Sequence, residues 1–286
     1  MGTLNLVPAS TGDYRRLAEK RLPRNLFDYL DGGAYEEKTL RANVEDFGKI
    51  VLHQRVMRDV SNIDTKVTVL GEDWDMPVGL APIGLAGMMA KRAEVQAVKA
   101  AQKLGVPYCL STAGICSLEE VGEAAVRPFW FQLYMMRDRG YVTNLLDRAK
   151  AVGCTTLVFT VDLAVVGTRY RDARNGMGGG LSTWGKIRAG LEYPMHPRWL
   201  KDVAIGGKPH NFGNLAEFVP SAKSIVDFKA WVDSQFDPMC TWKDIEWLRS
   251  VWDGKLVIKG VLNPQDAVDA QTAGADGVVV SNHGGR

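Results

Sequence analysis

Cysteine is scarce in this sequence, and no two cysteines form a Cys-x-x-Cys pair. The chain has four cysteines among 286 residues. Cys109 and Cys154 lie in or beside apolar runs. A disulfide-stabilised scaffold or a cysteine-rich zinc site needs closely spaced cysteines, so the pattern argues against both. We therefore expect buried, reduced thiols in a cytoplasmic protein, and no metal site.

The sequence also lacks a strong net charge and a long apolar run. Its formal net charge is +2, which gives no electrostatic case for a nucleic-acid partner. The uncharged run over residues 76–90 is too short to span a bilayer, and it contains two prolines and three glycines. Charged residues precede any apolar core near the N-terminus, so no signal peptide is predicted.

From residue 76 onward, short apolar segments alternate with helical patterns. Residues 157–159 and 277–280 are continuously apolar, which is typical of parallel strands covered on both faces. Glycine marks the joints between the helices and the strands that follow them. This alternation predicts an α/β fold. The expected strands are 78–82, 106–111, 129–134, 156–162, 256–261 and 277–282, and the expected helices are 93–104, 118–125, 141–152, 241–252 and 264–273.

Polar residues at the ends of these strands favour a barrel over a doubly wound sheet. Ser111, Gln132 and Lys259 each lie at the C-terminal end of an expected strand. In a (β/α)8 TIM barrel, reactive groups from many strands meet at that face. A dinucleotide-binding sheet would have a Gly-x-Gly-x-x-Gly turn after a strand, which is absent here. We predict a TIM barrel that is truncated at its C-terminus to about six of eight βα units; a complete six-stranded sheet is the alternative.

Two regions depart from this alternation of strands and helices. Residues 1–75 are predicted to form an N-terminal cap, with a helical pattern over 13–30 that Pro23 interrupts and a short strand at 65–70. The barrel is assigned to residues 76–286.

The second departure is an insertion at 173–240 within the barrel. A structureless loop of that length is rare, so we expect partial structure of its own, including a basic amphipathic helix over 181–193.

The run Ser281-Asn282-His283-Gly284-Gly285-Arg286 is the strongest functional signal. Histidine is the usual general base near neutral pH. Arginine can bind a carboxylate through two parallel hydrogen bonds. Together they suit a small carboxylic acid that loses a proton. On these residues alone, a loop histidine and a surface arginine remain the alternative.

This run resembles the signature of the FMN-dependent α-hydroxy-acid oxidases and dehydrogenases. Several segments elsewhere are similar to the same family in the same order. Further details resemble the bacterial respiratory L-lactate dehydrogenases more than plant glycolate oxidase. The family segments are 27–34, 80–85, 110–112, 130–134, 159–162 and 258–260, and the further details are 137–140, 169–172, 242–244 and the basic insertion.

The resemblance implies roles for individual residues. His283 takes a proton from the substrate while two electrons pass to the flavin, and Asp162 orients the imidazole and stabilises its charged form. Lys259 lies beside the flavin, where negative charge develops on reduction. Tyr134 is the remaining catalytic residue. The implied substrate-binding residues are Tyr29, Tyr134, Arg169 and Arg286, and the implied cofactor-binding residues are Pro82, Ile83, Gly84, Ser111, Gln132, Thr160, Lys259 and Ser281.

The implied reaction is the FMN-dependent oxidation of L-lactate to pyruvate, with electrons passed to a quinone or cytochrome. Oxidation of another L-2-hydroxy acid, such as mandelate or glycolate, is an alternative. Ala113 stands where glycolate oxidases have a tryptophan, which enlarges the substrate side. A non-catalytic fragment is a second alternative, because the family's phosphate-binding run on strands seven and eight is not in this sequence.

The resemblance also implies partners. The insertion over 176–236 combines Trp184, Tyr193 and Trp199 with several basic residues. Aromatic rings favour the headgroup boundary and basic side chains are drawn to anionic lipid. We expect a homo-oligomer that binds peripherally to the inner face of the cell membrane. A soluble lid over the substrate is the alternative reading of the insertion.

Overall fold

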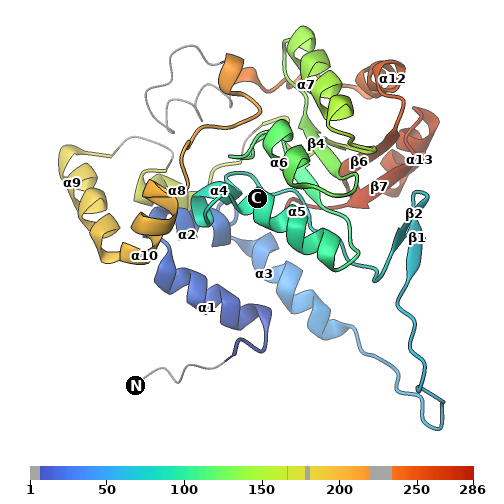
Figure 1. Cartoon of the computed structure of the whole chain (residues 1–286), viewed down its shortest axis with the longest axis horizontal. Helices are drawn as coiled ribbons and strands as arrows, with labels where there is room; N and C mark the ends of the chain where they lie inside the picture. The colour runs from blue at the N-terminus through green and yellow to red at the C-terminus, as the bar shows by residue number, and fades with distance from the viewer. Residues whose placement is uncertain (1–6, 166, 178–180, 219–233) are drawn as a thin grey trace.

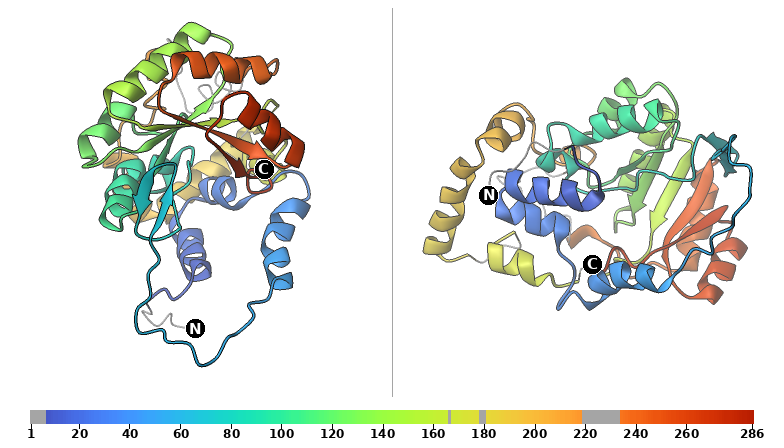
Figure 2. Two further views of the ribbon diagram at one scale, coloured as in Figure 1. Left: turned by 90° about the vertical axis from the view of Figure 1, so that its right-hand side faces the viewer. Right: turned by 90° about the horizontal axis from the view of Figure 1, so that it is seen from below.

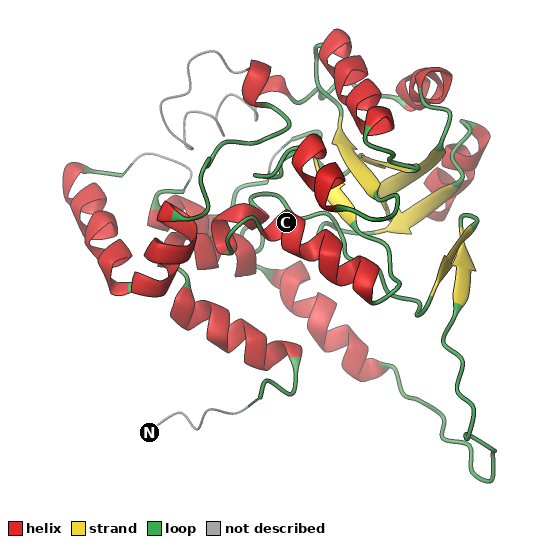
Figure 3. Cartoon of the chain, in the orientation of Figure 1, coloured by secondary structure: helices red, strands yellow, loops and turns green. Residues whose placement is uncertain are grey.

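A parallel sheet of five strands forms the centre of the computed structural model, which describes residues 7–165, 167–177, 181–218 and 234–286. Its spatial order β3-β4-β5-β6-β7 follows the sequence, as in consecutive units of a (β/α)8 barrel. Within the described residues the sheet is an open arc (Figure 3). The predicted fold class is therefore confirmed, with the barrel not closed. The strands are Cys109–Ser111, Trp130–Tyr134, Thr156–Thr160, Lys255–Val261 and Gly277–Val280.

The first predicted strand, 78–82, forms only a single parallel bridge between Leu80 and Tyr108. The Leu80 amide donates to the Pro107 carbonyl at 2.9 Å, and the Leu80 carbonyl accepts from Cys109 at 3.0 Å. Pro77 and Pro82 bracket the segment and have no N–H to donate, so the pairing stops after one residue.

Five helices follow the strands and cover the outer face of the sheet (Figures 1 and 2). The prediction of these helices is confirmed to within two residues at each end. Apolar side chains of the outer face, such as Phe131, Leu157 and Ile258, are fully buried in the main hydrophobic core. The helices are α5 (Ala93–Lys103), α6 (Leu118–Ala124), α7 (Arg139–Ala151), α12 (Trp242–Val251) and α13 (Pro264–Thr272).

The inner face of the sheet has a small apolar cluster at one end and polar residues at the other. Cys109, Val158 and Val257 form this cluster, with Leu70 and Trp130 packed against it. Leu70 is the turn of an antiparallel hairpin of β1 (Val67–Val69) and β2 (Glu72–Trp74). The hairpin therefore closes the N-terminal end of the inner face and leaves the C-terminal end for the site.

The N-terminal helices lie on the side of the sheet that the five outer helices do not cover. Pro23 separates α1 (Thr11–Arg21) from α2 (Arg24–Asp31), as predicted. Helix α3 (Lys38–Glu45) and the short α4 (Ala86–Met89) were not predicted. The division into a cap at 1–75 and a barrel at 76–286 stays a prediction.

The insertion contains more structure than the predicted helix alone. That helix is confirmed as α9 (Thr183–Glu192), while 178–180 and 219–233 lie outside the described residues. The insertion also contributes to the main hydrophobic core, where Val203, Phe212 and Leu215 are buried. The other elements are α8 (Tyr170–Asn175), η2 (Tyr193–Met195), α10 (Pro197–Trp199), η3 (Leu200–Ile205) and η4 (Ala216–Phe218).

Two of the three rings predicted to face the membrane are used in packing instead. The Trp199 side chain is 4% exposed, and its Nε1 donates to the Met88 carbonyl at 2.8 Å. Tyr193 packs 5.5 Å from the Trp199 ring and accepts from Asn25 Nδ2 at 2.9 Å. Trp184 is 80% exposed. Tyr193 therefore meets α2 and Trp199 meets α4, contacts between distant segments that composition could not reveal.

No helix in the described parts of the chain is long and apolar enough to cross a membrane. All four cysteines are free thiols; three are buried and Cys240 is partly buried. The described residues contain no cluster of side chains suited to a metal ion.

Candidate functional site

A row of polar side chains crosses the sheet at its C-terminal end. Tyr134 of β4 is in register with Thr160 of β5, and Thr160 is in register with Lys259 of β6. Residues paired in this way project from the same face of a sheet. Gln132 lies two residues before Tyr134 and so shares that face. The predicted residues from three strands therefore meet on the inner face.

The histidine turn after β7 requires an unusual backbone. His283, Gly284 and Gly285 all have positive φ, at 59°, 70° and 78°. Glycine adopts this region without strain, but histidine does so at a cost. The Ser281 hydroxyl accepts from the His283 amide at 3.0 Å. The chain therefore turns directly after β7.

Helix α3 fixes the same turn from outside. The Asn43 and Asn282 side-chain amides bond to each other in both directions, at 3.0 and 2.7 Å. A Cβ on Gly285 would lie 2.5 Å from the Leu40 amide nitrogen, so only glycine fits there. The Gly285 carbonyl accepts from Ala34 at 2.8 Å. Asn43 and Asn282 were not among the predicted site residues; the apolar and polar spacing of residues 38–45 was the signal that could have indicated α3.

His283 is paired with a carboxylate. Its Nδ1 lies 2.8 Å from Asp162 Oδ1, and both side chains are largely buried, at 18% and 13% exposed. Asp162 Oδ2 lies 3.8 Å from Lys259 Nζ. Gly260 allows this approach, because a Cβ there would lie 2.6 Å from Asp162 Cβ. One carboxylate therefore holds the imidazole and contacts the lysine.

Two arginines meet at the ring of Tyr29. The guanidinium carbons of Arg286 and Arg169 lie 4.9 and 5.4 Å from its centroid. Arg286 also donates to the Tyr29 and Leu30 carbonyls at the end of α2. Burial and the nearby charge of Arg169 lower the pKa of Arg286. Among the described residues no acidic side chain lies within 4.0 Å of Arg286, while Asp172 pairs with the neighbouring Arg169 at 3.8 Å and offsets part of the positive charge. The pKa of Arg286 is still lowered, so this position favours an added anion.

These groups surround a central cavity of about 420 Å³. Four predicted site residues do not line it: Ser111, Gln132, Thr160 and Asp162. Asp162 reaches the cavity through His283. Leu163, Phe212 and Phe236 also line the cavity and were missed, because nothing local in the sequence marks them. Ten predicted residues line it: Tyr29, Pro82, Ile83, Gly84, Tyr134, Arg169, Lys259, Ser281, His283 and Arg286.

Beneath the cavity lie buried polar atoms that have no hydrogen-bond partner among the residues that the structure describes. Ser111 Oγ donates to Gln132 Oε1 at 3.0 Å, which leaves Gln132 Nε2 unbonded. Thr160 Oγ1 is also buried without a hydrogen bond within the described residues. Unsatisfied buried donors and acceptors are costly and rare. A flat ligand with a polar edge, such as an isoalloxazine ring, would satisfy them, so the residues fit a flavin.

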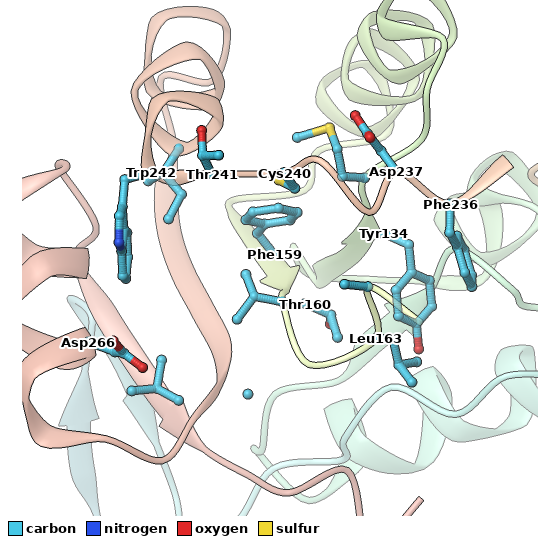
Figure 4. Close-up of a pocket in the computed structure, with 16 residues that line it drawn as sticks. Tyr134, Phe159, Thr160, Leu163, Phe236, Asp237, Cys240, Thr241, Trp242 and Asp266 are labelled. Carbon is cyan, nitrogen blue, oxygen red and sulfur yellow. The ribbon is translucent and has the colours of Figure 1, made fainter. Parts of the chain in front are cut away.

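A second, side cavity of about 380 Å³ lies beside the first turn of α12. Tyr134, Leu163 and Phe236 line both cavities. Figure 4 shows Tyr134 and Phe236 side by side on one wall and Trp242 on the opposite wall. The remaining walls are mostly apolar. Burial raises the pKa of the Tyr134 hydroxyl, so this group stays protonated between the two cavities.

The family model described as FMN-dependent dehydrogenase matches residues 18–286. The match covers nearly the whole chain, and the protein belongs to the FMN-dependent dehydrogenase family. The family assignment and the FMN cofactor predicted from the sequence are thereby confirmed.

Three similar proteins have names that are more specific than that of the family. A protein of Ectopseudomonas mendocina named L-lactate dehydrogenase is 53% identical over 281 residues, which are 98% of this chain and 73% of the relative. An L-lactate dehydrogenase of Acinetobacter baylyi is 51% identical, over 98% of this chain and 72% of the relative. A crystal structure of the monotopic membrane protein (S)-mandelate dehydrogenase matches with TM-score 0.89 and 36% identity, covering 99% of this chain and 74% of the other.

Proposed function

We propose that this protein is an FMN-dependent L-lactate dehydrogenase that produces pyruvate. The observation that supports this most directly is the meeting of Arg169 and Arg286 at Tyr29, beside the His283–Asp162 pair. It offers an anion site and a base side by side. The relatives named L-lactate dehydrogenase, at about half identity over the chain, favour lactate as the acid.

His283 is the proposed base. Asp162 occupies Nδ1, so Nε2 is the ring nitrogen that remains for the substrate. Oxidation of the alcohol carbon removes two electrons and two protons, and His283 accepts one of these protons. Asp162 then stabilises the imidazolium. The FMN, when bound, would supply the acceptor for the two electrons and the second proton.

The substrate carboxylate is assigned to Arg286 and Arg169. A carboxylate would relieve the repulsion between two largely buried guanidinium groups and form charge-assisted hydrogen bonds. The hydroxyls of Tyr29 and Tyr134 are the proposed donors to substrate oxygens. Both residues line the central cavity with the two arginines.

The flavin is assigned to the row of polar side chains on the inner face of the sheet and to residues 82–84, which precede α4. The free atoms of Gln132 and Thr160 suit its polar edge. Lys259 would place a positive charge where the reduced ring becomes more negative. The remaining proposed contacts are Ser111, Ser281 and the backbone of Pro82, Ile83 and Gly84.

Replacement of His283 by Ala tests the base. We expect the variant to keep its yellow flavin but to be reduced by L-lactate at least about 10²-fold more slowly, the usual cost of losing a positioned base. Rapid-mixing absorbance measures this rate. Reduction at the wild-type rate would refute the role. A colourless wild-type protein with no flavin bands would instead favour the non-catalytic fragment.

A larger L-2-hydroxy acid is the second candidate substrate. A crystal structure of mandelate oxidase with (S)-4-hydroxymandelic acid matches this chain with TM-score 0.79 and 32% identity, over 98% of this chain and 71% of the other. Two small residues, Gly84 and Ala113, line one side of the central cavity. They lie close together, because a Cβ on Gly84 would be 3.4 Å from Ala113 Cβ. Steady-state turnover of L-lactate, glycolate and L-mandelate separates these substrates by kcat/KM.

A membrane contact is proposed for α9. Trp184, Ile187 and Leu191 are spaced by three and four residues, so they form one stripe along the helix. Their exposed fractions are 80%, 47% and 67%. Lys186 and Arg188 lie beside the stripe and are also exposed. An apolar stripe flanked by basic residues suits an anionic lipid surface.

Polar substitution of the stripe tests this contact. Trp184→Gln with Leu191→Gln should weaken binding to vesicles containing anionic phospholipid by roughly 30- to 150-fold, because two apolar side chains contribute on the order of 2–3 kcal/mol when partly inserted. Val56→Gln with Met57→Gln is the matched control, since these side chains are 72% and 97% exposed elsewhere. Equal sedimentation of both double variants with vesicles would refute the contact.

The electron acceptor is proposed to be a quinone or a cytochrome. A soluble quinone analogue should reoxidise the reduced flavin faster than dissolved oxygen does, and stoichiometric peroxide would indicate an oxidase instead. We also propose a homo-oligomer, which light scattering of the purified protein tests directly.

A further inference from the structure

One arginine fastens α8 to α2. Arg171 Nη1 donates to Asp31 Oδ2 at 2.9 Å, and Nη2 donates to Glu37 Oε2 at 2.7 Å. A third carboxylate, that of Asp28, lies 3.9 Å from Nη1. The guanidinium therefore bridges the end of α2 and the residue that precedes α3.

The two acidic partners are themselves fixed and charged. Arg15 donates to Asp31 Oδ2 at 2.7 Å, and the Gly33 amide donates to Glu37 Oε1 at 3.1 Å. Both carboxylates are 15% exposed. Burial alone would raise the pKa of Glu37, but hydrogen bonds from Arg171 and Gly33 lower it below its ordinary value. This is a partly buried network rather than a solvated surface pair.

The network ends at the groups that are assigned to the substrate carboxylate. Arg169 precedes α8 as its N-cap, two residues before Arg171. Tyr29 lies two residues before Asp31 on α2. The Tyr35 amide also donates to the Thr168 carbonyl at 2.9 Å, so the segment after α2 is joined to the segment before α8. The spacing of α2 and α8 thus sets the distance between Arg169 and the Tyr29 ring.

We propose that Arg171 is a positioning residue that holds Arg169 where it and Arg286 can bind one carboxylate. The proposal rests on the proposed function only in taking a 2-hydroxy-acid anion as substrate. Arg171 does not line the central cavity, so it acts through Arg169. A planar fork is needed because two separate carboxylates are bound from one side chain, which the single ammonium of lysine cannot reproduce.

The test measures flavin reduction by L-lactate in Arg171→Met, Arg171→Lys and the wild type. The rate of flavin reduction, measured by rapid mixing at increasing L-lactate concentrations, gives an apparent Kd for lactate and a limiting rate for each protein. We expect the apparent Kd to rise roughly tenfold or more in Arg171→Met, because a misplacement of about 1 Å in a binding group is costly. The limiting rate should fall less, since His283 and Asp162 are untouched. Arg171→Lys should lie between.

Arg174→Met is the matched control. It removes the same charge from the same helix, but its guanidinium is exposed and lies over the Tyr170 ring, 5.6 Å from the centroid. Its apparent Kd should stay within twofold of the wild type.

The outcomes separate the two proposals. A wild type that lactate does not reduce refutes the proposed function. A wild type that lactate reduces, with Arg171→Met unchanged in apparent Kd, refutes the positioning role. Equal increases in Arg171→Met and Arg174→Met also refute it. If Arg171→Met does not fold, Arg171→Lys decides by the same criterion.

Discussion

Replacing Asp162 by Asn should slow flavin reduction sharply while leaving the shape of the site almost unchanged. The carboxylate accepts from His283 Nδ1 at 2.8 Å, and asparagine can place an oxygen at the same point. What asparagine cannot supply is the negative charge that stabilises the imidazolium. Lys259 Nζ, at 3.8 Å from the other oxygen, would also lose its ion pair.

The expected size of the effect follows from the charge separation. Two unit charges about 4 Å apart attract by about 4 kcal/mol at an effective dielectric constant of about 20. Because 1.36 kcal/mol corresponds to tenfold in rate, full loss of this attraction in the transition state would slow reduction by about 10³-fold. Both side chains are less than a fifth exposed, so solvent screening removes only part of this.

The assay is single-turnover reduction of bound FMN by saturating L-lactate. Asp162 does not line the central cavity, so flavin content should equal that of the wild type. Asp266→Asn is the control, because it removes the same charge from the wall of the side cavity and should leave the rate unchanged. A limiting rate within fivefold of the wild type in Asp162→Asn would show that the paired charge does not assist proton transfer.

Three further predictions concern other parts of the site. Arg286→Lys should raise KM for lactate at least tenfold and lower kcat, because an ammonium lacks the paired donors; steady-state values within twofold of the wild type would move carboxylate binding to Arg169. Gly260→Ala should lower the urea midpoint and slow flavin reduction, because the residue has φ of 110° and its Cβ would lie 2.6 Å from Asp162 Cβ; an unaltered midpoint and rate would contradict this. Burial raises the pKa of the Cys240 thiol from 9.0 to about 12, so alkylation at pH 8 should be about 1,000-fold slower than for an unperturbed thiol; mass spectrometry showing rapid labelling would contradict the burial.

Periodicity was sufficient to identify the α/β architecture. The strands expected at 156–162 and 256–261 are the central strands β5 and β6, and the helices at 93–103 and 139–151 were predicted to within two residues. These predictions succeed because the alternation of buried and exposed positions is a local property of the chain. The same reasoning failed for residues 78–82, where flanking prolines limit pairing to one bridge.

The sequence by itself also determined the chemistry at the strand ends: a histidine, an arginine and a buried lysine that resemble one enzyme family. Only the tertiary structure decided how these groups meet. Arg286 bonds to the carbonyl of Tyr29 across 257 residues of chain, and Asn43 of the unpredicted helix α3 holds the histidine turn. Such contacts depend on which faces of the N-terminal helices, of the segment 173–240 and of the central sheet pack together. That packing is fixed by burial and pairing between distant segments, and no local pattern records it.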